Sequence, residues 1–255
     1  MNKIPILIDF DGVIKLGDDL APDAGEFFKF ITKNNFNTCI ISNSTLRTGI
    51  DVTQFFVDKD LSVEIPVMTA VDATINYVKD HYKKVSVYCV ENIKELFADF
   101  IDDQNPEAVV IGDNGNKWDF QLMNEIFQKV FNGADIIAMQ MNRYWYPQGG
   151  ELSLDAGSFI KAIEYSSAKE AILIGKPSSI YFHSALQMLG YQSNSEFIMI
   201  GDDIESDIIG AQKAGGKGLL IYTGKTKFPL ANKLNIKPDY EAKNLRDVIE
   251  IINTI

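Results

Sequence analysis

The amino-acid sequence predicts an α/β protein with a Rossmann-like core on a parallel sheet, and a second α/β module inserted into that core. Short apolar runs alternate with segments of helical apolar spacing near both the start and the end of the chain. Between these halves, residues 84–167 have apolar runs of their own. We therefore expect a discontinuous core over 1–80 and 171–255, and an inserted α/β cap over 81–170.

The first half predicts two buried strands, each followed by a helix. Ile4–Ile8 and Asn37–Ile41 are apolar on both faces, as strands inside a parallel sheet are. Ala24–Asn34 places Phe and Ile residues at helical spacing, and Thr69–Tyr82 shows a similar pattern. Such βαβα order predicts parallel strands with right-handed crossovers.

The second half resumes this alternation. Its predicted strands are Ala171–Ile174, Phe197–Ile200 and Leu219–Tyr222. Its predicted helices are Ser179–Leu189 with Gly190 just after its end, one from Ser206 or Asp207 to Gly215, and one capped by Asn244. These elements complete the core.

The inserted region has the same kind of alternation. Its predicted strands are Val85–Val90, Ala108–Ile111 and Ile136–Met139, and its clearest helix is Phe120–Val130. Residues 143–154 combine aromatic residues with two glycines, a composition typical of a hairpin or a mobile loop.

Composition excludes several classes of partner. The 255 residues include 24 basic and 35 acidic side chains, a net charge of −11, which argues against nucleic acid and anionic membranes as partners. No run approaches the roughly 18 apolar residues of a membrane span, and we expect no signal peptide. Cys39 and Cys89 lie in apolar runs and are expected to be reduced thiols. We expect a cytoplasmic protein.

Two aspartates follow the first predicted strand, in Asp9-Phe-Asp11-Gly12. Simple strand alternation would place both carboxylates on one face, where they would repel each other unless a cation lay near them. The alternative is that they cap a helix or form an Asx-turn, in which Asp and Gly are equally common.

Polar residues also follow the other core strands. The complete set at four strand ends is Asp9 with Asp11, Ser42, Lys176, and Asp202 with Asp203 and Asp207. Ligands of open α/β sheets bind at the carboxyl ends of the strands, so these side chains are expected to form one site.

The residue types at this site fit phosphoryl transfer. A carboxylate such as Asp9 can act as nucleophile, and Asp11 can protonate a leaving alkoxide and later activate water. Mg²⁺ prefers carboxylates, carbonyls and waters, which Asp9, Asp202 and a backbone oxygen would supply. Ser42 can hold the oxygens of the transferring group, while Lys176 neutralises their charge.

These motifs resemble those of the haloacid dehalogenase (HAD) superfamily. Asp-Phe-Asp-Gly-Val-Ile resembles its first motif, Ser42 its second, Lys176 its third, and Gly-Asp-Asp-Ile-Glu-Ser-Asp its fourth. Only 33 positions separate Asp9 from Ser42, whereas 134 separate Ser42 from Lys176, which corresponds to an insert at the second cap site. With Ile-Gly-Lys-Pro-Ser, the pattern resembles the NagD-like, type IIA branch.

The resemblance implies a role for each matching residue. Asp9 would be the nucleophile and Asp11 the general acid and base. Ser42 and the backbone of Asn43 would hold the phosphoryl group, and Lys176 would orient both Asp9 and the phosphate. Dehalogenases of the superfamily lack an acid at the position of Asp11, so that chemistry is not expected here.

The resemblance also implies a metal site. Mg²⁺ would be bound by Asp9, Asp202 and the backbone carbonyl of Asp11. Asp207 would anchor the groups behind these ligands, and the part of Asp203 stays open. Both Asp203 and Asp207 are also plausible N-cap residues of the following helix.

The cap departs from the type IIA pattern. Where the branch commonly has Thr-Asn-x-Asp and then Pro-Gly-x-Gly, this chain has Met139–Trp145 and then Leu154–Ser158. Arg143, Tyr144 and Trp145 are candidate substrate contacts; the alternatives are a solvated charge for Arg143 and hairpin packing for Tyr144-Trp145-Tyr146. This basic-aromatic run is similar to that of phospholysine, phosphohistidine and pyrophosphate phosphatases.

We therefore predict a Mg²⁺-dependent phosphatase that acts on a small phosphorylated metabolite through an aspartyl-phosphate. A phosphotransferase or mutase, or a phospho-amino acid or pyrophosphate phosphatase, would use the same core. A receiver-type signalling module is about half as long, and a non-catalytic scaffold would not need these acids. A homodimer formed through the cap is a further expectation.

Overall fold

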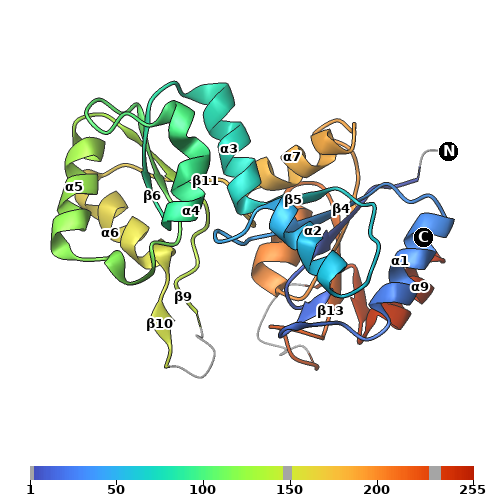
Figure 1. Ribbon diagram of the computed structural model, residues 1–255. Coiled ribbons are helices and arrows are strands. Elements are labelled where there is room, and N and C mark those ends of the chain that lie inside the picture. Colours follow the sequence, from blue (N-terminus) through green and yellow to red (C-terminus); the bar gives the residue numbers. More distant parts are fainter. Residues whose placement is uncertain (1–2, 146–150, 230–236) are drawn as a thin grey trace. The chain divides into compact units, whose positions relative to one another are not determined.

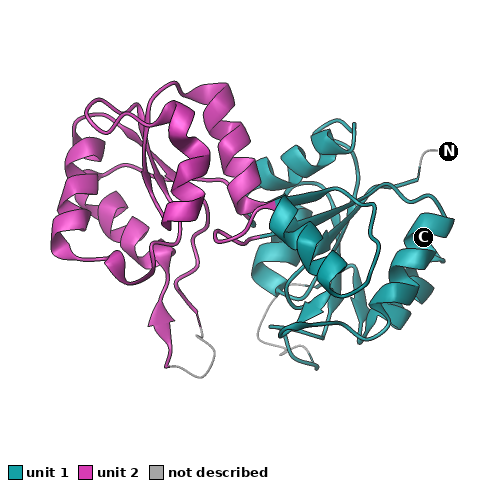
Figure 2. Ribbon diagram, viewed as in Figure 1, with its two compact units in different colours: residues 1–42, 49–68, 176–255 teal, residues 43–48, 69–175 magenta. Residues whose placement is uncertain are grey.

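The computed structural model describes residues 3–145, 151–229 and 237–255, which form two compact units (Figures 1 and 2). Unit 1 comprises residues 1–42, 49–68 and 176–255, and unit 2 comprises residues 43–48 and 69–175. Unit 2 is thus inserted, in two pieces, into the sequence of unit 1.

A six-stranded sheet forms the centre of unit 1. Its order is β14 (Tyr240–Ala242), β13 (Lys217–Ile221), β12 (Ile198–Gly201), β1 (Ile6–Asp9), β4 (Thr38–Ser42) and β5 (Val67–Thr69). The neighbours of β1 are both parallel to it, with Ile8 in register with Ile200 and Ile40. The carboxyl ends of β12, β1 and β4 therefore lie side by side.

Helices cover this sheet. They are α1 (Ala24–Lys33), α2 (Gly49–Asp58), α7 (Ser179–Met188), the π-helical turn η3 (Ile204–Ile209), α8 (Gly210–Lys213) and α9 (Leu245–Ile252). Ile6, Ile8 and Phe10 share one apolar core with α1, α2 and α9, because alternate residues of β1 and its continuation face the same side. A short hairpin, β2 (Lys15–Leu16) with β3 (Asp19–Leu20), follows β1.

Unit 2 has its own parallel sheet. The order is β11 (Ile172–Leu173), β8 (Asp135–Ala138), β7 (Ala108–Ile111) and β6 (Val85–Tyr88). Its helices are α3 (Ala70–His81), α4 (Glu91–Lys94), η1 (Glu95–Phe100), η2 (Gly115–Lys117), α5 (Phe120–Phe131) and α6 (Ala156–Ser167). The apolar faces of α5 and α6 pack with this sheet in a second core.

The structure confirms the predicted α/β fold, with corrections in detail. The strand predicted at Ala171–Ile174 is not part of the core sheet, because Ile172 and Leu173 pair with β8 of unit 2. The helix predicted from Ser206 or Asp207 begins earlier, at Ile204, because the Asp203 side chain caps it. The compact units also divide near residues 68/69 and 175/176 rather than at 80/81 and 170/171, with α3 grouped in unit 2.

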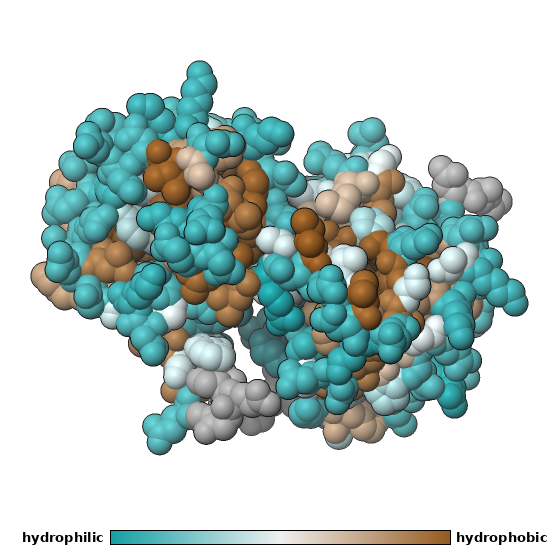
Figure 3. Space-filling model, in the orientation of Figure 1, coloured by the Kyte–Doolittle hydropathy of each residue, from teal (hydrophilic) through white to brown (hydrophobic). Residues whose placement is uncertain are grey.

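The surface is mostly polar on the face shown in Figure 3, with apolar residues gathered over α2 among other places. Ile50 and Val57 of α2 are 81% and 60% exposed. Among the described residues, no helix combines the length and the apolar character that crossing a membrane requires.

Phe10, which separates the two aspartates, anchors the end of β1 in the core. Its ring is fully buried and meets the rings of Phe55 and Phe56 edge to face, at centroid distances of 5.3 and 5.7 Å. This packing fixes the backbone on which both Asp9 and Asp11 stand.

We therefore expect Phe10→Ala to lower the free energy of unfolding of unit 1 by about 3–5 kcal/mol, because it leaves a large core cavity. Urea denaturation followed by circular dichroism would measure it. The control, Val57→Ala on the exposed side of α2, should change stability by less than about 0.5 kcal/mol. Equal effects of the two variants would contradict an anchoring role for Phe10.

Candidate active site

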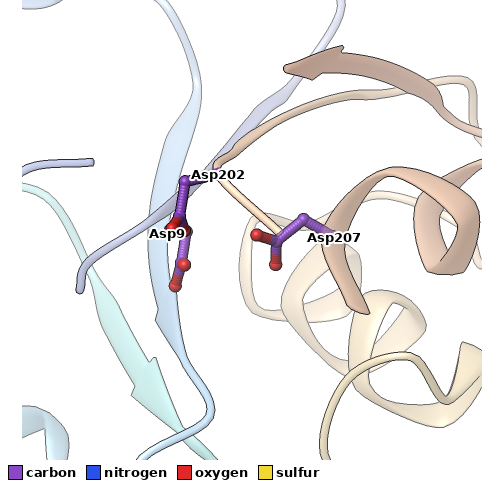
Figure 4. A group of neighbouring side chains, drawn as sticks. All are labelled: Asp9, Asp202 and Asp207. Atoms are coloured by element: carbon purple, nitrogen blue, oxygen red, sulfur yellow. The ribbon is translucent and has the colours of Figure 1, made fainter. Parts of the chain in front are cut away.

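Three carboxylates meet at the carboxyl ends of β1 and β12 (Figure 4). Asp9 is the last residue of β1, Asp202 directly follows β12, and Asp207 lies in η3. One oxygen from each lies within 4.8 Å of the others, although the three residues are only 7%, 5% and 0% exposed. This acid cluster is the centre of the candidate site.

Gly201 allows this close approach. A Cβ atom at residue 201 would overlap the Cβ and carboxyl group of Asp207. The first residue of the Gly-Asp-Asp motif must therefore lack a side chain if η3 is to bring Asp207 against the end of β12.

Lys176 is the buried cation of the site. It is 3% exposed, and its Nζ lies 2.7 Å from Asp9 Oδ1 and 2.7 Å from Asp207 Oδ1. The Phe10 N–H also donates to Asp9 Oδ1, at 2.8 Å. One ammonium thus holds two of the three acids in place.

Asp11 lies apart from the acid cluster. Its Oδ2 accepts a hydrogen bond from Ser42 Oγ at 3.3 Å, and its Oδ1 lies 3.6 Å from Lys15 Nζ. The backbone bends at Phe10 and turns at Gly12, whose φ of +90° favours glycine.

Tyr181 of α7 holds the end of β4, although it belongs to none of the sequence motifs. Its hydroxyl accepts from the Ser42 N–H at 3.2 Å and lies 2.6 Å from the Ser42 carbonyl oxygen. Because Tyr181 forms part of an ordinary apolar helix pattern, only the fold reveals that it positions Ser42.

Asp203 and Asp207 have different partners. Asp203 Oδ1 accepts from the N–H of Glu205 at 3.0 Å, and its Oδ2 pairs with Lys225 Nζ. Asp203 is therefore the N-cap of η3, whereas Asp207 lies inside that turn and accepts the Asp203 N–H at 3.0 Å.

The charge balance of the acid cluster favours a bound cation. Burial, reinforced by Asp207, raises the pKa of Asp202 to about 6, and burial raises the pKa of Asp9 well above its usual range despite the opposing charge of Lys176. Burial alone would lower the pKa of Lys176, but Asp207 and Asp9 outweigh it. Three carboxylates against one ammonium leave an excess negative charge that a hard divalent cation with oxygen ligands would offset.

The remaining predicted residues belong to unit 2. The Asn43 side chain lies against Gly175, where a Cβ would overlap its Oδ1. Tyr144 and Trp145 form β9, which pairs with β10 (Ser153–Leu154), and are 46% and 48% exposed. The Arg143 guanidinium lies 5.8 Å from the centre of the Tyr144 ring. Tyr146 lies outside the described residues.

A buried network supports this hairpin. Gln140 is 3% exposed, and its Nε2 donates to Asp155 Oδ1 at 2.6 Å. The same Asp155 oxygen accepts the Ala156 N–H and caps α6, and the Asp155 N–H donates to the Arg143 carbonyl oxygen. These bonds fix Arg143 at the base of the hairpin.

The raised pKa of Asp202 makes the charge balance of the acid cluster testable in the metal-free protein, with EDTA present to remove metal ions. The folded chain holds this proton more tightly than the unfolded chain, whose value is near 3.8, so the contribution of Asp202 to stability falls as pH rises from about 4 to about 6. The free energy of unfolding of Asp202→Asn should therefore exceed that of the wild type by on the order of 1–3 kcal/mol at pH 7, and should equal it near pH 4. Urea unfolding would measure both.

Its neighbour provides a control of opposite sign. Burial would raise the pKa of Asp203, but the hydrogen bond and charge of Lys225 lower it. Asp203→Asn should therefore be less stable than the wild type at pH 7, with a difference that shrinks in acid. A loss of stability in Asp202→Asn at pH 7 without metal would contradict the charge excess.

Known family models match two parts of the chain. A haloacid dehalogenase-like hydrolase model matches residues 6–100, and a HAD-hydrolase-like model matches residues 173–248. Haloacid dehalogenase-like hydrolase domain-containing protein 2 of Bos taurus is 31% identical over 236 residues, covering 91% of this chain and 89% of its own. Phospholysine phosphohistidine inorganic pyrophosphate phosphatase of Mus musculus is 33% identical over 213 residues, covering 83% and 77%.

Solved structures share the whole fold. The p-nitrophenyl phosphatase from Archaeoglobus fulgidus matches with a TM-score of 0.88 and 24% identity, over 98% of this chain and 100% of its own. NagD from Escherichia coli K-12 matches with a TM-score of 0.82 and 23% identity, over 96% and 98%. On these comparisons, the chain belongs to the haloacid dehalogenase-like hydrolase family and is a phosphatase-type hydrolase with the type IIA, NagD-like fold.

Proposed function

We propose that this protein is a Mg²⁺-dependent phosphatase that hydrolyses a small phosphomonoester, such as a sugar phosphate or a nucleotide, through an aspartyl-phosphate on Asp9. The observation that supports it best is the buried Asp9 carboxylate, held by Lys176 beside Asp202 and Asp207. Phosphatase relatives and the matching fold support the reaction class.

In the first step, an oxygen of Asp9 attacks phosphorus and the bond to the leaving alkoxide breaks. Asp11 protonates that alkoxide. This role suits Asp11 because it does not belong to the acid cluster. In the second step, Asp11 takes a proton from water as the water attacks phosphorus. The acyl-phosphate bond then breaks, which releases phosphate and restores Asp9.

The phosphoryl oxygens need donors, which Ser42, the Asn43 N–H and Lys176 would supply. Mg²⁺, bound by Asp9, Asp202 and the Asp11 carbonyl oxygen, would offset the charge of the phosphoryl group. Asp207 already has Lys176 and the Asp203 N–H as partners, so its role is to position Lys176.

The inserted region, 81–170, would act as the cap that selects the leaving group. Arg143, Tyr144 and Trp145 are its candidate substrate contacts, and the Asp155–Gln140 network would hold them. The name of the mouse relative favours phospho-amino acids or pyrophosphate as the second candidate substrate class.

Two further calls belong to this proposal. The buried free thiols of Cys39 and Cys89 support a location in the cytoplasm, where thiols stay reduced. A homodimer formed through unit 2 would be detected by light scattering of the purified protein.

Removal of the nucleophile should abolish turnover. Asp9→Asn keeps the size of the side chain but cannot form the acyl-phosphate, so we expect kcat to fall at least about 10³-fold. Hydrolysis of p-nitrophenyl phosphate would measure it, with circular dichroism to verify folding. The control Asp19→Asn, on the exposed hairpin β2–β3, should retain wild-type kcat. Retained turnover in Asp9→Asn would exclude Asp9 as nucleophile.

A substrate panel separates the candidate reactions. With Mg²⁺, we expect release of inorganic phosphate from at least one phosphomonoester and none after EDTA treatment. Phosphate released in equal amount with and without acceptor sugars indicates a phosphatase, whereas transfer to the sugar indicates a phosphotransferase or mutase. Preference for phospholysine, phosphohistidine or pyrophosphate over sugar phosphates and nucleotides would favour the second substrate class.

A further inference from the structure

The loop that follows β13, residues 223–226, lies against Asp202. The sheet order explains why: β12 lies between β1 and β13, so the segments that leave β1 and β13 flank the residue that follows β12. Gly12 comes from the first of these segments and Gly224 from the second. Neither glycine belongs to the metal ligands proposed above.

Both glycines are in contact with the Asp202 carboxylate. A Cβ at Gly12 would lie 2.5 Å from Asp202 Oδ2, and a Cβ at Gly224 would overlap the same oxygen. The carboxylate is therefore enclosed between two backbone segments that leave no room for a side chain.

Hydrogen bonds join the same groups. The Lys225 N–H donates to Asp202 Oδ2, and the Thr226 N–H donates to the Asp202 carbonyl oxygen at 3.0 Å. Thr223 Oγ1 donates to the Gly12 carbonyl oxygen at 2.6 Å, which ties the two flanking segments to each other. Thr226 Oγ1 in turn accepts the Ile204 N–H at 3.2 Å.

We propose that the 223–226 loop is a positioning element that sets Mg²⁺ affinity by holding Asp202 in a single orientation. With Oδ2 fixed by the Lys225 N–H and enclosed by Gly12 and Gly224, the carboxylate would offer its other oxygen to the metal in one orientation. A ligand held in this way loses little freedom on binding, which increases affinity. This inference rests on the proposed Mg²⁺ site.

The test is Mg²⁺ binding to the full, EDTA-treated chain, measured by isothermal titration calorimetry. In Gly224→Ala the new Cβ would overlap the carboxylate and lie 2.9 Å from the Gly12 Cα, so that both would have to shift, and we expect Kd for Mg²⁺ to rise at least about tenfold. Gly224 is not among the glycines with positive φ, so its own backbone conformation is compatible with alanine. The matched control is Gly25→Ala in α1, where a Cβ meets only Leu61 at 3.8 Å and Kd should stay at the wild-type value.

Thr223→Val is the second variant and decides the matter if Gly224→Ala does not fold. It keeps the shape of Thr223 but removes the bond to Gly12, so Kd should rise about 3- to 10-fold. Unchanged Kd in the folded variants, with weaker binding in Asp202→Asn, would overturn the positioning role and leave the metal site standing. Equal or absent Mg²⁺ binding in the wild type and Asp202→Asn would overturn the metal site itself.

Discussion

The arrangement of the site depends on one buried cation. Lys176 lies between Asp9 and Asp207, with Nζ 2.7 Å from an oxygen of each, in a place almost closed to solvent. A buried ion pair contributes little net stability, because desolvation offsets its Coulomb energy, but removal of one partner is costly. The ion pairs are better explained by the conformation that they specify: Lys176 holds Asp9 in one orientation and pairs with one oxygen of Asp207. Asp202 is then the acid least compensated by the protein, which suits a metal ligand.

The sheet brings these groups together without any local sequence proximity. Asp9 and Asp202 are far apart in the chain but end adjacent parallel strands, β1 and β12. Glycines then allow contacts that other residues would prevent: Gly201 admits Asp207, and Gly224 admits Asp202. The site therefore depends on these glycines, which leave room for the carboxylates, as well as on the charged side chains themselves.

The strands with apolar runs on both faces could be predicted because burial in a parallel sheet leaves a clear pattern, as at β1, β4 and β12. Once these strands were predicted, the acids that follow β1 and β12 could be predicted to lie at one edge of the sheet. Sequence could not place Ile172–Leu173 correctly, because the pattern of a buried strand is the same in either sheet. Nor could it single out Tyr181 or Gly224, whose importance comes from contacts with Ser42 and Asp202 made only by the folded chain. The helix start at Ile204 was missed because three candidate caps lie within five residues.

The points at which the chain passes between the two units have an evolutionary consequence. It leaves unit 1 after Ser42 for residues 43–48, returns at Gly49, leaves again after Met68 and returns at Lys176. Asp9, Asp202 and Asp207 lie well inside unit 1 segments. Exchange of the larger piece, 69–175, for another of different size would thus leave the acids untouched, but its second junction adjoins Lys176, a residue proposed to bind the phosphoryl group. Diversification of this piece is therefore free in its interior and constrained at the Lys176 junction, so new specificities can arise in the interior while the core chemistry stays the same.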